Sequence, residues 1–214
     1  MRFCCAAWLR LFLLALCINA LTLAVSAQET AGGALNALRQ PSWNYGFQIY
    51  GGTATMATPP IPGAPGRYPS SWGAEFHLAR VLTNEHVEGW GRGTLEWDLN
   101  LIPVVNYYAA GRTYYMAGLE AVSARWNFTR INRRFVPFFG FDGGMLMGPD
   151  QFPPGDTSRF NFTVGLDLGA HIFTRQRQSF DTTIRLHHLS NAETGHYNPG
   201  VPLSIQLMLG YTWF

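Results

Sequence analysis

His188 and Ser190 are the two residues whose types and spacing best suit chemistry. They lie in the segment 184–190, where alternation along an extended strand would place both side chains on one face. An imidazole within hydrogen-bond reach of a hydroxyl can act as a general base and make the alcohol a nucleophile toward an ester. Asn191, the next residue, could donate an amide hydrogen to the developing oxyanion. The pair therefore has the groups that serine-dependent ester hydrolysis needs.

The same pair also has a simpler interpretation. His-x-Ser is a short and common pattern, and both side chains could instead lie at the polar edge of a membrane, where they cost little. On the predicted strand they lie on the same apolar face as Ile184 and Leu186. Whether this face meets lipid or a protein interior decides what the pair can do. The choice between the two interpretations depends on the elements that position the pair.

Those elements are strands, because apolar and polar residues alternate along most of the chain. The predicted strands cover residues 43–50, 73–82, 94–101, 114–128, 135–147, 160–172, 180–190 and 204–213. Several reach the length of about 9–11 residues that a tilted membrane strand needs. Aromatic residues gather near strand ends, as in the interface girdles of membrane barrels: Trp43, Trp72, Trp90, Tyr107, Tyr108, Tyr114, Tyr115, Trp126 and Trp213.

These features predict an all-β fold, an eight-stranded antiparallel up-and-down transmembrane β-barrel. A soluble sandwich with its apolar faces buried is the alternative. Eight strands enclose only enough room for side chains, so the polar faces should form an interior network: Glu75, His77, Glu96, Asp98, Glu120, Asp142, Asp167, His171, Arg185 and His187. Turns are expected at 83–91, 129–134 and 174–179 at one end, and loops at 53–71, 106–113, 148–158 and 191–202 at the other.

Residues 1–27 read as a cleaved secretory signal peptide, with a membrane anchor as the alternative, and residues 28–214 as a single domain. All three cysteines lie in the leader, so the mature chain has no disulfide and no cysteine-based metal site. All 15 basic residues are arginines, against 13 acids. This balance gives no basic stripe for nucleic acid, and no apolar run after the leader approaches the roughly 20 residues of a spanning helix.

The stretch His188-Leu189-Ser190-Asn191-Ala192, followed by 198–200 and a last strand ending in Phe214, resembles the lipid A 3-O-deacylase (PagL-type) family of outer-membrane barrels. The similarity extends upstream to 93–96, 137–139, 143–144 and 158–162, and so covers most of residues 73–214. The resemblance implies an outer-membrane enzyme that removes an ester-linked acyl chain from lipid A, the lipid anchor of lipopolysaccharide. It implies no cofactor and no metal.

Carried over by position, the resemblance makes Ser190 the nucleophile, His188 the base and Asn191 a contributor to the oxyanion hole. The family places an orienting glutamate just after the loop glycine, where this chain has Pro202. The acids on outer loops that could replace it are Glu193, Asp150 and Asp156, and Glu193 is the nearest in sequence. Loss of the acid would reduce the rate by orders of magnitude.

Outer-loop arginines could contact lipid phosphates, and Arg112 and Arg159 are the candidates, although both also fit ordinary exposed charges. The missing glutamate keeps a non-catalytic structural or adhesive barrel open as an alternative function. The long Pro-rich loop 53–71 keeps open a barrel that binds a ligand or partner. The sequence leaves undecided which acyl position is cleaved and whether the chain acts as a homodimer.

Overall fold

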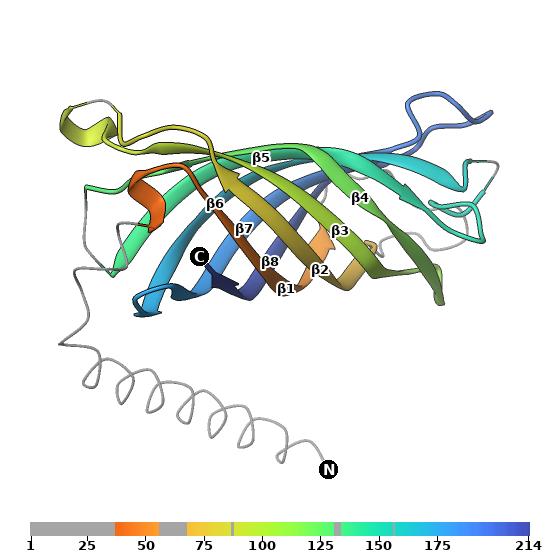
Figure 1. Ribbon diagram of the computed structural model, residues 1–214. Coiled ribbons are helices and arrows are strands. Elements are labelled where there is room, and N and C mark those ends of the chain that lie inside the picture. Colours follow the sequence, from red (N-terminus) through yellow and green to blue (C-terminus); the bar gives the residue numbers. More distant parts are fainter. Residues whose placement is uncertain (1–36, 56–67, 87, 131–133, 156) are drawn as a thin grey trace, which may run out of the picture.

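The computed structural model describes residues 37–55, 68–86, 88–130, 134–155 and 157–214, and the predicted leader 1–27 lies outside them. The described chain forms eight antiparallel strands, each paired with its sequence neighbours, and β1 pairs with β8 to close a barrel (Figure 1). The strands are β1 (Ser42–Ala54), β2 (Ser70–Val81), β3 (Thr94–Ala109), β4 (Arg112–Asn127), β5 (Phe135–Met147), β6 (Phe160–Arg175), β7 (Gln178–Ser190) and β8 (Val201–Trp213). The predicted up-and-down barrel is confirmed. None of the helices in the described ranges is long and apolar enough to span a bilayer.

Most large apolar residues in the middle of the strands face outward, and the buried charged residues face the lumen. On β7, Ile184 and Leu186 are 52% and 42% exposed, whereas Arg185 and His187 are buried. A soluble sandwich would show the reverse, whereas a barrel surrounded by acyl chains requires this orientation. The polar residues expected in the interior are all buried, from Glu75 to His187.

The connections define two ends of the barrel. Leu38 and Phe214 belong to one apolar cluster, so both ends of the described chain lie at the same end of the barrel, here called the terminal end. The opposite end, here called the loop end, carries the β1–β2, β3–β4, β5–β6 and β7–β8 connections. The predicted loop 106–113 is wrong, because β3 and β4 continue almost to their junction. Ala110 and Gly111 join them, both at positive φ, as tight hairpin turns require.

Charged residues fill the middle of the lumen. Arg185 is the centre of this network, and its guanidinium lies close to four carboxylates: Asp142 at 2.7 Å, Asp167 at 2.8 Å, Glu120 at 3.4 Å and Glu75 at 3.5 Å. A second guanidinium, that of Arg125, lies 3.7 Å from Asp98 and 4.0 Å from Glu96. Buried charges need such partners, so the network occupies the space that a pore would need.

Apolar side chains fill the lumen at the loop end. Phe152, from the β5–β6 connection, is fully buried there, stacked on Tyr107 with 4.6 Å between ring centroids and tilted against Tyr114 at 5.3 Å. The expectation that Tyr107 and Tyr114 belong to the outer girdle is therefore wrong, because both rings turn inward to cover Phe152. At the terminal end Phe214, out of phase with the outer face of β8, packs inside against Phe173.

Candidate active site

The outer face of β7 changes from apolar to polar toward the loop end. His188 and Ser190 continue the row of Ile184 and Leu186 and are half-buried. On β6, Val164 lies opposite His188 and Phe162 lies opposite Ser190. An imidazole and a hydroxyl thus stand side by side on a wall that is otherwise apolar, as alternation along the strand predicted.

A bulge in β8 forms the other side of this site. Val201 pairs with Leu189 and Ser204 pairs with His187, so Pro202 and Leu203 lie together opposite the single residue His188. Proline has no N–H to give to a strand ladder and is confined to edges and bulges within sheets. The sequence prediction began this strand at 204 and missed the bulge, although the proline just upstream is the signal that could have revealed it.

The His188 ring is anchored by the bulge. Its Nδ1 lies 3.0 Å from the main-chain oxygen of Pro202. A carbonyl oxygen only accepts hydrogen bonds, so Nδ1 carries the hydrogen. In the neutral ring the lone pair then resides on Nε2, which is the atom available to take a proton.

Ser190 makes no hydrogen bond to the imidazole within the described part of the chain. The hydroxyl stands two residues from His188 on the same face, and catalytic hydrogen bonds are often unformed before substrate binds. Gly200, at φ 57°, passes close to this point, and a Cβ there would lie 3.5 Å from the Cβ of Ser190 and 2.8 Å from the Leu189 oxygen. The chain is thus tightly packed between Gly200 and the end of β7.

Asn191 organises the β7–β8 connection. Its side chain is buried, its Nδ2 donates to the Tyr197 oxygen at 2.9 Å, and its Oδ1 accepts from the Glu193 N–H at 2.9 Å. Its own N–H donates to Asn198 Oδ1 at 3.2 Å. A primary amide has two hydrogens, and these contacts use one of them.

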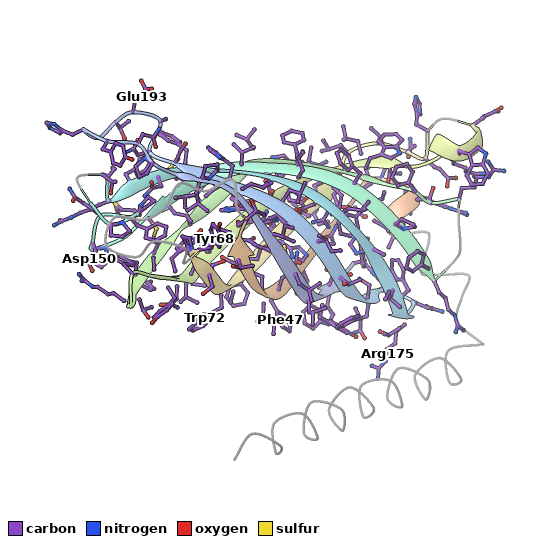
Figure 2. The ribbon with its side chains drawn as sticks, turned by 180° about the vertical axis from the view of Figure 1, so that it is seen from behind. Phe47, Tyr68, Trp72, Asp150, Arg175 and Glu193 are labelled. Atoms are coloured by element: carbon purple, nitrogen blue, oxygen red, sulfur yellow. The ribbon has the colours of Figure 1, made fainter. Side chains whose placement is uncertain are left out.

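Neither of the two described carboxylates considered as orienting acids, Glu193 and Asp150, bonds to His188. Glu193 is exposed at the tip of the β7–β8 connection, at φ 62° (Figure 2). Asp150 is paired with Arg112 at 2.8 Å, and Asp156 lies outside the described residues. The structure therefore brings His188 and Ser190 together and gives the ring a neutral partner, Pro202, within the described ranges.

Two hollows of the described surface lie away from His188 and Ser190. An apolar hollow of about 470 Å³ lies elsewhere on the outer wall, over β8, β1 and β2, with Gly51, Trp72 and Leu207 among its lining residues. A second, polar hollow of about 510 Å³ lies at the terminal end, between Glu85 and Arg130. The described ranges contain no cluster of three His, Asp or Glu side chains that could hold a metal ion.

Comparison with known proteins decides the family. Residues 65–212, more than half of the chain, match the family model described as lipid A 3-O-deacylase (PagL). The chain belongs to the PagL family. The family's name agrees with the resemblance carried by His188 and Ser190, and none of the curated proteins matches the sequence.

A solved structure shares the fold of this PagL-family chain, and further solved barrels resemble it more weakly. The crystal structure of the outer membrane enzyme PagL has a TM-score of 0.50 and 17% identity, with 78% of this chain and 99% of that chain covered. The crystal structure of Neisserial surface protein A has a TM-score of 0.46 and 13% identity, with 81% of this chain and 97% of that chain covered. The N-terminal β-barrel domain of Pseudomonas aeruginosa OprF has a TM-score of 0.44 and 10% identity, with 81% of this chain and 100% of that chain covered.

Proposed function

We propose that this chain is an outer-membrane esterase that hydrolyses an ester-linked acyl chain of lipid A or a related envelope lipid. The observation that carries the proposal is the position of His188 and Ser190 on the outward, apolar wall, with the imidazole held through Nδ1. Membership of the PagL family supports lipid A as the substrate. The loop end would face outside the cell, and substrate would reach the site laterally within the outer leaflet.

The chemistry follows from the two side chains. Ser190 Oγ attacks the ester carbonyl while His188 Nε2 takes its proton. The tetrahedral intermediate then expels the alcohol of the lipid, which receives that proton from Nε2, and the acyl chain stays on Ser190. A water molecule, deprotonated by the same nitrogen, releases the fatty acid and restores the hydroxyl.

The remaining predicted residues have supporting roles in this proposal. The second amide hydrogen of Asn191, which its loop contacts do not use, is the donor for the oxyanion. Glu193 could orient His188 only if the tip of the β7–β8 connection folded back toward the wall. Arg159 is exposed beside the start of β6 and is positioned to meet a lipid phosphate, whereas Arg112 is already paired with Asp150.

Mass spectrometry of lipid A incubated with the purified protein in detergent tests the proposal. The native chain should release one acyl chain, and Ser190→Ala should lower the rate by roughly a thousandfold or more while its heat-modifiable gel mobility stays intact. Thr182→Ala is the matched control, because it removes a hydroxyl from the same face of β7 far from the site. Activity that survives Ser190→Ala would disprove the nucleophile assignment.

One observation favours the alternative of a non-catalytic barrel. The described partner of the His188 ring is a neutral carbonyl, which stabilises a charged imidazolium less than a carboxylate does. Lipid A that keeps all its acyl chains, both with purified protein and in cells expressing the chain, would establish this alternative.

A further inference from the structure

The two main-chain oxygens of the β8 bulge are both used. Leu203 O accepts from the Thr55 N–H at 2.8 Å and from its hydroxyl at 3.2 Å. Pro202 O accepts from His188 Nδ1 at 3.0 Å. Bulges are frequent next to active sites, where they redirect a group out of the ladder. Here the redirected group is a carbonyl, and its acceptor atom meets an imidazole.

We propose that the main-chain carbonyl of Pro202 is the positioning group that sets His188 as the base, in the place that a carboxylate takes in a Ser-His-acid triad. The inference rests on the proposed function, because it assigns a role within the same site. The sequence and the bulge produce it together: Pro202 has no N–H for the ladder, and the extra residue opposite His188 turns the oxygen toward the ring.

A carbonyl performs one of the two tasks of a triad acid. It holds the hydrogen on Nδ1 and so leaves the lone pair on Nε2, the atom that the proposed function uses as the base for Ser190. Its dipole, however, stabilises the imidazolium formed during acylation less than a full negative charge would. During the reaction the hydrogen stays on Nδ1, and only the serine proton moves, first to Nε2 and then to the leaving alcohol.

Within the described ranges, the Pro202 carbonyl is the polar group that contacts the His188 ring. β6 presents Val164 to the ring, and β8 presents Leu203 beside Pro202. The titratable neighbours are His187, which is buried on the inner face of β7, and Glu193 and His196 on the connection that follows. A carboxylate introduced beside Nδ1 would therefore enter a place with no other acid in contact.

Nitrogen NMR on the full chain in detergent tests the tautomer directly. With ¹⁵N-labelled histidine, and the His188 signals assigned by their loss in His188→Gln, the neutral ring should carry its hydrogen on Nδ1. A neutral ring with hydrogen on Nε2 would overturn the inference. This readout does not depend on activity, so it separates the inference from the proposed function.

Substitutions at Pro202 test the consequence for rate. Pro202→Glu should raise kcat at least about tenfold over Pro202→Gln, its neutral match in size, and move the acidic limb of the pH profile up by about one unit. Pro202→Ala keeps the carbonyl and should retain the native tautomer. Equal rates and profiles for the Glu and Gln variants would overturn the inference, whereas lipid A that keeps all its acyl chains with the native chain would instead overturn the proposed function.

Discussion

The charge of Arg185 should stabilise the barrel far more than any exposed arginine does. Its guanidinium, 3% exposed, lies within 3.5 Å of four buried carboxylates. Arg185→Met would leave these carboxylates uncompensated, and breaking a buried ion pair in this way costs about 3–5 kcal/mol. With a urea m-value of about 2 kcal/mol/M, the unfolding midpoint should fall by roughly 2 M.

Arg112→Met is the matched control for this change. Arg112 and Asp150 form a pair at 2.8 Å whose side chains are 60% and 44% exposed, and such pairs contribute about 0–1 kcal/mol. Urea unfolding of both variants in the same detergent, followed by tryptophan fluorescence, measures the difference. Equal shifts in the two midpoints would refute the reasoning that the lumen network stabilises the closed barrel.

Two further predictions concern the ends of the barrel. Burial would raise the pKa of Glu85, but hydrogen bonds from Arg92 and Thr129 outweigh it and hold the pKa below its ordinary value. The ionised carboxylate therefore stabilises the barrel fully at neutral pH, and this stabilisation is lost in acid. Glu85→Gln should flatten the acidic part of a curve of unfolding free energy against pH. Phe152→Ala removes the ring stacked on Tyr107 and should lower the free energy of unfolding by about 3–5 kcal/mol; a loss below about 1 kcal/mol in urea unfolding would show that Phe152 does not stabilise the loop end.

The barrel could be predicted because the pattern that specifies it is local in the sequence. Period-two alternation assigns each residue to a face, and a face that is apolar over a membrane-length strand must meet lipid. His188 and Ser190 inherit their outward position from this rule alone. The same rule places Arg185 and His187 inside.

Other features depend on contacts between distant segments. Tyr107 and Tyr114 turn inward because Phe152, more than thirty residues further along the chain, enters the lumen between them. The partner of His188 is supplied by Pro202 through a register shift that no strand pattern contains. The sequence indicates Glu193 as the partner of His188, because an acidic side chain is visible in a sequence. A main-chain carbonyl has no such sequence signature.

The lumen network and the outer site share one strand, and this links the stability of the barrel to the proposed catalysis. Arg185 and His187 alternate with Leu186 and His188 along β7, so every ion pair of Arg185 also fixes the backbone that carries the imidazole. Catalytic groups must be held within about 0.5 Å of their working geometry, which strands do better than loops. His188 lies on the outward face of β7, and its described polar contact is the Pro202 carbonyl. The rigid lumen behind β7 and the carbonyl of the adjacent bulge therefore supply the orientation that an enclosed site would otherwise provide.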